Sequence, residues 1–356
     1  MKKWAKITVA VVAVAVIAGA GTWEYLTSAA SSDPCSGVNL GLPTGSSTAV
    51  AYTHSPDAIR GGAPATTIPR GQSLALTLAG PLQVVAAENF WGSLVRQLGG
   101  NQTTVLSIVT DPNADPHEYE ANASDAKAIA SAQYVVVNGV GYDDWALQLI
   151  AADGNSNQLV LNVGTLNGVN VGGGIVSGNP HMWYNPVYVN RTVAAMFSNL
   201  VELRPSATPV FQANYAALNV TLGQLYARAE EIRTQFAGTV VAATEDIFVY
   251  LANYTQLDLV SPPAFMEAVA EGNDPPAQSV VQFQCQLESG KVHVLVYNEQ
   301  TVTPITSSMK AIAAANNVSV VGVTETIQPS DVTFQVWMNA EYLSLQNALN
   351  ANALGH

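Results

Sequence analysis

Residues 209–236 read PVFQANYAALNVTLGQLYARAEEIRTQF, and this stretch decides how the rest of the chain is organised. Its apolar side chains recur at alternating intervals of four and three residues, at Phe211, Tyr215, Leu218, Leu222, Leu225, Ala229, Ile232 and Phe236. This spacing predicts a helix with one apolar stripe. Counted from Ser206, the helix would be about 45 Å long at 1.5 Å per residue, long enough to run along two lobes. The alternative is a coiled-coil seam between two chains.

Short apolar strands alternate with helices on both sides of this helix. We predict strands at Leu82–Ala86, Thr104–Val109, Tyr134–Asn138, Thr239–Ala243, Val292–Tyr297 and Ser319–Val323, and helices at Asn89–Leu98 and Ser124–Ala132, with Ser124 as an N-cap. The pattern predicts an α/β fold of two lobes, each with a mainly parallel sheet flanked by helices, joined by one long linking helix. We expect the first lobe at 81–205, the linking helix at 206–237 and the second lobe at 238–356.

The composition excludes several classes of protein. Apolar residues make up 48% of the chain and charged residues 11%, which is typical of a globular body and excludes a disordered chain. The formal net charge is -13, and three of the 13 basic residues, Lys2, Lys3 and Lys6, lie at the very start. So acidic a body repels nucleic acid and attracts cations.

The amino-terminal region predicts export. A basic start, the apolar run from Ile7 to Ile17 and the small residues that follow indicate a signal peptide or a retained anchor over residues 1–20. Residues 21–80 are rich in Ser, Gly, Pro, Ala and Thr and predict a tether, in which His54 has no expected role. The residues before Cys35 lack the pattern that precedes a lipid-modified cysteine. Cys35 and Cys285 are the only cysteines and could pair in an oxidising compartment.

Imidazole and carboxylate groups follow several predicted strands or loops. His117 lies in Asp115-Pro116-His117-Glu118-Tyr119 and His181 in Asn179-Pro180-His181-Met182-Trp183, each directly after a proline that restricts the backbone. Glu245 and Glu325 each follow a threonine at the end of a strand. Because ligands of open α/β sheets collect at the carboxyl ends of strands, and because divalent first-row metals prefer these donors, the pattern indicates a metal site.

Several ordered stretches resemble the substrate-binding proteins of manganese and zinc ABC transporters, whose two lobes are joined by a rigid helix. The resemblance covers Leu82 to Leu349 and includes Phe90-Trp91-Gly92, Asp115-Pro116-His117-Glu118-Tyr119-Glu120, Ser124-Asp125-Ala126-Lys127, Asn138-Gly139-Val140-Gly141-Tyr142-Asp143, Pro180-His181-Met182-Trp183, Glu271-Gly272-Asn273-Asp274-Pro275 and Val296-Tyr297-Asn298-Glu299-Gln300-Thr301.

The resemblance implies a ligand set of His117, His181, Glu245 and Glu325 for one divalent ion. It implies that the protein is no enzyme and delivers the ion to an ABC permease in the membrane. We expect a monomer at the cell surface or in the periplasm, held there by its amino-terminal segment. Glu245 stands where manganese-associated relatives often have Glu and zinc-associated ones His, which favours manganese over zinc.

Other interpretations of the same residues stay open. Glu299 and Asp331 are the chief rivals of Glu325, while His293 and His356 are expected to be structural or incidental. A secreted zinc-dependent hydrolase could use a His-His-Glu set, but the chain has no His-Glu-x-x-His run, and a fourth protein carboxylate would occupy the position that water needs. Some members of the family are labelled surface adhesins, and no residue here indicates a host partner.

Overall fold

The computed structural model describes residues 35–43, 80–111, 116–153, 155–172 and 178–353. The predicted signal or anchor, most of the predicted tether with His54, and residues Asp115 and His356 lie outside these ranges. Among the described residues, no helix combines the length and the apolar character needed to cross a membrane.

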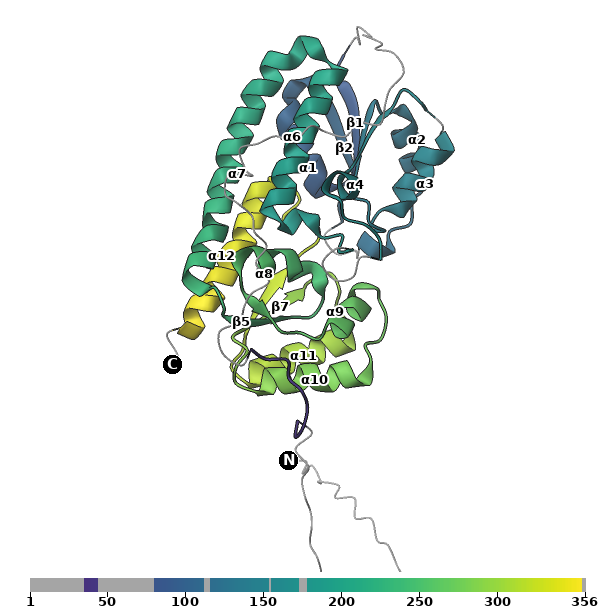
Figure 1. Ribbon diagram of the computed structural model, residues 1–356. Coiled ribbons are helices and arrows are strands. Elements are labelled where there is room, and N and C mark those ends of the chain that lie inside the picture. The colour runs from purple at the N-terminus through teal and green to yellow at the C-terminus, as the bar shows by residue number, and fades with distance from the viewer. Residues whose placement is uncertain (1–34, 44–79, 112–115, 154, 173–177, 354–356) are drawn as a thin grey trace, which may run out of the picture.

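Each lobe is built on one four-stranded sheet in which all paired strands are parallel, which confirms the fold class expected from the sequence (Figure 1). The first sheet has the order β2-β1-β3-β4 and the second the matching order β6-β5-β7-β8. The strands are β1 Leu82–Glu88, β2 Thr103–Val109, β3 Tyr134–Val137, β4 Leu159–Asn162, β5 Val240–Ala243, β6 Asp258–Leu259, β7 Val294–Asn298 and β8 Ser319–Val323.

Helices flank both sheets and run between them. The first lobe carries α1 Asn89–Gly99, α2 Ala123–Ser131, α3 Asp144–Asp153, α4 Val163–Asn167 and α6 Pro186–Leu203; α7 Thr208–Phe236 links the lobes; the second lobe carries α8 Val249–Thr255, α9 Pro263–Ala270, α10 Ala277–Glu288, α11 Pro304–Ala315 and α12 Phe334–Ala353. The limits expected for the two lobes stay a prediction.

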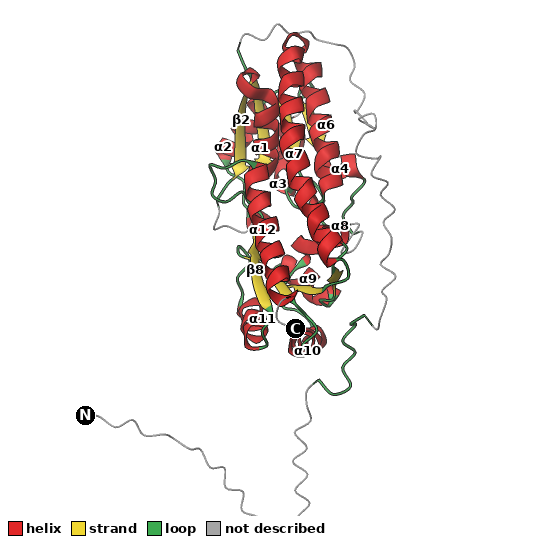
Figure 2. Ribbon diagram, turned by 90° about the vertical axis from the view of Figure 1, so that its left-hand side faces the viewer, coloured by secondary structure: helices red, strands yellow, loops and turns green. Residues whose placement is uncertain are grey.

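The apolar stripe of α7 is the centre of the structure. Seven of its eight predicted positions are buried, and the eighth, Tyr215, is half-buried and stacks on Phe197. The stripe packs against α1, α6 and α12 of the same chain (Figure 2), so it leaves no seam for a second copy. The coiled-coil alternative for this stripe is therefore wrong.

The sequence pattern did not reveal that α12 returns along α7. Arg228 of α7 donates hydrogen bonds to Asn339 at 2.7 Å and to Gln346 at 2.9 Å, both on α12. One continuous apolar core extends from the first sheet through these two helices to the second sheet. Because separating the lobes would expose this shared core to water, large opening is unfavourable.

The amino-terminal cap of helix α2 differs from the expectation. Helix α2 is capped by Asn122 and not by Ser124: the Asn122 side chain accepts from the Ser124 backbone at 2.8 Å, and Asp125 accepts from the Asn122 backbone at 2.8 Å. The prediction of Ser124 as the cap was wrong because an acceptor two residues earlier takes that role.

Cys35 and Cys285 form a disulfide that ties residues 35–43 to α10.

Candidate metal centre

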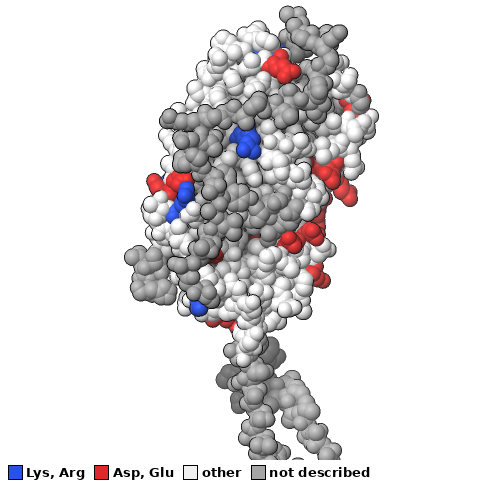
Figure 3. All heavy atoms as spheres, viewed as in Figure 1, with Lys and Arg blue, Asp and Glu red and all other residues white. Residues whose placement is uncertain are grey.

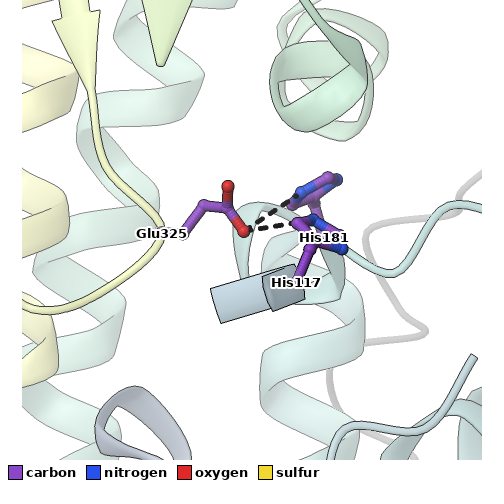
Figure 4. Close-up of side chains that lie close together, drawn as sticks. All are labelled: His117, His181 and Glu325. Carbon is purple, nitrogen blue, oxygen red and sulfur yellow. Dashed lines mark ion pairs between the residues drawn. The ribbon is translucent and has the colours of Figure 1, made fainter. Parts of the chain in front are cut away.

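Three of the four predicted ligands converge where the lobes meet. His117 lies in a short 3-10 turn, Pro116–Glu118, that follows β2; His181 immediately precedes a second turn, Met182–Tyr184; Glu325 follows β8. One ligand atom from each lies within 4.8 Å of the others. Figure 4 shows the Glu325 carboxylate, from the second lobe, pointing at the two imidazoles of the first lobe.

The geometry of the three groups suits a small cation. Oε2 of Glu325 lies 3.3 Å from Nε2 of His117 and 3.7 Å from Nε2 of His181. His181 and Glu325 are completely buried, whereas the His117 side chain retains 23% of its exposure. Solvent therefore reaches the group from the His117 side.

Glu325 is held by groups from both lobes. Tyr142, which follows β3 in the first lobe, donates to Oε2 at 2.7 Å, and Asn298, at the end of β7, donates to Oε1 at 2.5 Å. The backbone N–H of Glu325 donates to the side chain of Gln300 at 2.7 Å. Tyr142, Asn298 and Gln300 were not assigned roles from the sequence, although Tyr142 and Asn298 also stand at carboxyl ends of strands, which was the available signal.

The loop that presents His181 is also fixed by side chains. The Asn138 amide donates to the Pro180 carbonyl at 2.9 Å, and Trp91 donates to Asn138 at 3.0 Å. Nδ1 of His181 lies 2.9 Å from Oδ1 of Asn179 and 3.2 Å from Oδ1 of Asp246. Such outer contacts set the orientation of a ligand.

Glu245 is buried but stands outside the group of three. It follows β5, is 1% exposed, and neither carboxylate oxygen has a hydrogen-bond partner among the described residues. Its ligand atoms do not come within 4.8 Å of all three others. The rivals Glu299 and Asp331 are both exposed and lie outside the group of three.

The charges of the site shift the pKa values of its members in opposite directions. Burial alone would lower the pKa of His181, but the hydrogen bonds and charges of Asp246 and Glu325 outweigh burial and raise it to about 10. Burial alone would raise the pKa of Glu325, but the two histidines outweigh it and hold that pKa well below its usual range. Burial, and next the charge of Glu325, raise the pKa of Glu245 well above its usual range.

A second pair of carboxyl groups, Glu88 and Asp143, is buried close to the loop after β3. Asp143 accepts from the backbone N–H groups of Asn138 at 2.6 Å and Gly139 at 2.7 Å. Burial, and next the charge of Asp143, raise the pKa of Glu88 well above its usual range. The raised pKa of Glu88 favours its neutral form. Burial also raises the pKa of Asp143, against the backbone hydrogen bonds of Asn138 and Gly139, and these bonds stabilise the loop that carries Asn138 and Tyr142.

Glu88→Gln is expected to make the protein more stable relative to wild type as pH rises. A raised pKa in the folded state means that the stability contributed by Glu88 is fully present below the unfolded pKa of about 4.3 and is lost as pH rises through the folded value. Glutamine keeps the neutral shape and has no such loss. Urea unfolding at pH 5, 7 and 9 measures the difference, with Glu231→Gln on the exposed side of α7 as the matched control. A stability difference that does not change with pH would contradict a neutral Glu88.

The surface around the lobes is sparsely charged, and acidic side chains predominate. On the face shown in Figure 3, Asp and Glu gather along the right-hand edge, while Lys and Arg are few. The formal net charge of -13 has the same sign. This charge attracts cations toward the protein.

Comparison with known proteins places the chain in a family. Residues 84–348 match the ZnuA family, described as "Zinc-uptake complex component A periplasmic". The manganese-binding lipoprotein MntA of Halalkalibacterium halodurans is 28% identical over 147 residues, covering 40% of this chain and 47% of that protein. The MntA of Bacillus subtilis is 26% identical over 180 residues, covering 48% and 57%. The chain thus aligns with about half the length of these relatives.

Solved structures share the fold over a larger part of the chain. The periplasmic zinc-binding protein TroA of Treponema pallidum has a TM-score of 0.64 at 17% identity, covering 76% of this chain and 99% of that one. The protein FpvC of Pseudomonas aeruginosa, in complex with Mn²⁺, has a TM-score of 0.62 at 20% identity, covering 76% and 99%. The matched family consists of transport components and not of enzymes, so the hydrolase alternative is set aside. The family match spans most of the sequence and both sheets, and this chain belongs to the ZnuA family.

Proposed function

We propose that this protein captures one divalent transition metal ion between its lobes and delivers it to an ABC permease. The observation that carries the proposal is the convergence of His117, His181 and Glu325 within 4.8 Å, from elements of both lobes. Glu245 is the proposed fourth ligand, because its buried carboxylate has no hydrogen-bond partner among the described residues and because the charge of Glu325 raises its pKa. A small movement of this side chain would complete the set.

The proposed set balances the charge of its cargo. Two neutral imidazoles and two carboxylates around a dication give a buried complex without net charge, so no counter-ion has to be buried. Without the cation, two carboxylates share a buried site, which is unfavourable. The ion therefore stabilises the packed arrangement of the lobes. The shared core around α7 and α12 supports a small closure on binding and not a wide hinge motion.

We propose manganese as the physiological cargo, with zinc as the alternative. A His2Glu2 set offers more hard oxygen than a set with three histidines, and carboxylates can bind through two oxygens to raise the coordination number. The two MntA relatives are named for manganese, whereas the family name and the name of TroA refer to zinc. Affinity alone does not decide, because the Irving–Williams order favours zinc over manganese at almost any such site.

The proposed place of work is outside the cytoplasm. The relatives are described as lipoproteins or periplasmic proteins, and a disulfide suits an oxidising compartment. We propose that residues 1–20 direct export, that the amino-terminal segment holds the protein at the envelope, and that the protein acts as a monomer.

Metal titration and uptake together test this function. Calorimetric titration of the metal-free protein with Mn²⁺ and with Zn²⁺ is expected to give one ion per chain. Uptake of both metals is then compared in a strain that relies on this protein and in its deletion. Loss of manganese uptake on deletion supports the proposal. If the strain that relies on this protein imports zinc but no manganese, only the choice of manganese is overturned. Unchanged uptake of both metals would contradict a role in transport and leave an adhesin as the remaining reading.

A further inference from the structure

The imidazole of His181 makes different contacts on its two sides. On the Nδ1 side it faces two acceptor oxygens, Oδ1 of Asn179 at 2.9 Å and Oδ1 of Asp246 at 3.2 Å. On the Nε2 side it has no hydrogen-bond partner among the described residues and faces the Glu325 carboxylate at 3.7 Å. The ring is therefore held by contacts at Nδ1, whereas Nε2 points toward Glu325.

The contacts of Asn179 decide which of its side-chain atoms faces the ring. Its Oδ1 accepts from the His181 backbone N–H at 2.8 Å, and its amide nitrogen donates to the Asp246 carbonyl at 2.7 Å. A reversed amide would place N–H against N–H and carbonyl against carbonyl. Because both neighbours of Nδ1 are then acceptors, Nδ1 carries a proton, whether or not the other nitrogen does.

Asp246 differs from Asn179 in its charge and in its origin. It follows Glu245 in the second lobe, whereas His181 belongs to the first, so this contact crosses between the lobes. The residue is 7% exposed, and its Oδ1 has no other hydrogen-bond partner among the described residues. A buried carboxylate oxygen requires a donor, and the Nδ1–H of His181 lies within reach of this one.

We propose that Asp246 is a positioning residue for His181, which accepts the Nδ1–H proton across the lobe junction and aims Nε2 at the captured cation. The inference rests on the proposed function and adds to it a residue that does not touch the ion. A carboxylate behind a ligating imidazole fixes the ring and makes the opposite nitrogen a stronger donor. Because Asp246 lies on the second lobe, His181 is fully oriented only when the lobes are packed together.

Two substitutions at Asp246 test the positioning role. Asp246→Ala removes the acceptor and is expected to lower the affinity for Zn²⁺ or Mn²⁺ by about 10- to 100-fold, the usual effect of losing such a contact. Asp246→Asn keeps an acceptor oxygen without the charge and is expected to lose less. Asp331→Ala and Asp331→Asn, at an exposed carboxylate, are the matched controls and should bind as wild type does.

A spectroscopic measurement separates positioning from a general loss of structure. In ¹⁵N-labelled protein, free and zinc-loaded, the Nδ1–H proton of His181 should give a downfield, slowly exchanging signal, assigned by its absence in His181→Ala. Asp246→Asn should shift this signal upfield, and Asp246→Ala should broaden or abolish it. If Asp246→Ala does not fold, the Asp246→Asn signal and affinity decide.

The outcomes distinguish this inference from the proposed function. An Nδ1–H signal unchanged in Asp246→Asn, or wild-type affinity in Asp246→Ala, would overturn the positioning role while wild-type binding upholds the metal site. A wild-type protein that binds neither Mn²⁺ nor Zn²⁺ would instead overturn the proposed function. A graded loss of affinity from wild type through Asp246→Asn to Asp246→Ala, matched by the graded signal, supports both.

Discussion

Glu325→Gln is expected to lower the affinity for Mn²⁺ or Zn²⁺ by at least two orders of magnitude. The binding free energy of a four-ligand zinc site is about 10–16 kcal/mol, so one ligand accounts for about 3 kcal/mol. This corresponds to a change in affinity of more than about 100-fold. Glutamine keeps the size of the side chain and an oxygen that can accept from Asn298, so the fold should survive. What is lost is the charge that faces both histidines. Calorimetric titration measures the change.

Glu299→Gln is the matched control, because Glu299 directly follows the neighbouring strand β7 but is exposed and outside the group of three. His117→Ala and His181→Ala should show losses comparable to that of Glu325→Gln. His293→Ala is the control for the two histidine variants, because His293 precedes β7 and so lies at the amino end of that strand, away from the site. Near wild-type affinity in Glu325→Gln and in both ligand histidine variants would refute the site.

Cation binding at pH 7 is expected to release at least one proton per ion, from His181. The pKa of His181 is raised to about 10, so the metal-free ring carries a second proton that the ion must displace. The raised pKa of Glu245 favours its protonated form, and this carboxyl group must also ionise to bind. Affinity should therefore increase as pH rises from about 6 to 9, whereas an unperturbed histidine with a pKa near ~6.5 would give a plateau above pH 7.

Calorimetry in buffers with different ionisation enthalpies counts the protons released. Glu245→Gln should lower the number of protons released, because glutamine has no proton to lose. The exposed Glu299→Gln should leave the count unchanged. A release close to zero in wild type, with affinity constant from pH 7 to 9, would contradict the shifted pKa values and the role of Glu245 as the fourth ligand.

The architecture could be predicted because it depends on periodic patterns. The apolar stripe from Phe211 to Phe236 has only one way to bury itself, as a helix, and β8 agrees with its predicted bounds at both ends. The return of α12 along α7 left no comparable signal. Helices that are apolar on more than one side, or that lie over several elements, do not reveal their partners by periodicity alone.

The four-residue ligand set stays a prediction, and the sequence did not predict the geometry of its members. His117 and Glu325 follow strands β2 and β8 of the two sheets, His181 lies in a loop well after β4, and the structure brings the three together. Glu245 also follows a strand, β5, but stands outside the group, and Asp246, beside it in the sequence, contacts His181 instead. Which of two adjacent carboxylates faces an imidazole depends on backbone angles in the turn after β5, which no residue pattern encodes.

The sequence by itself determined the two parallel sheets, the long linking helix and the kinds of side chain at their meeting edges, because burial periodicity and strand ends are local properties of the chain. Only the tertiary structure decided that Tyr142 and Asn298 hold Glu325, that Asn179 and Asp246 grip His181, and that Cys35 reaches Cys285. Two of these contacts, Tyr142 with Glu325 and Asp246 with His181, cross between the lobes. Their distances depend on how the lobes pack around α7 and α12, so they exist only once the whole chain has folded.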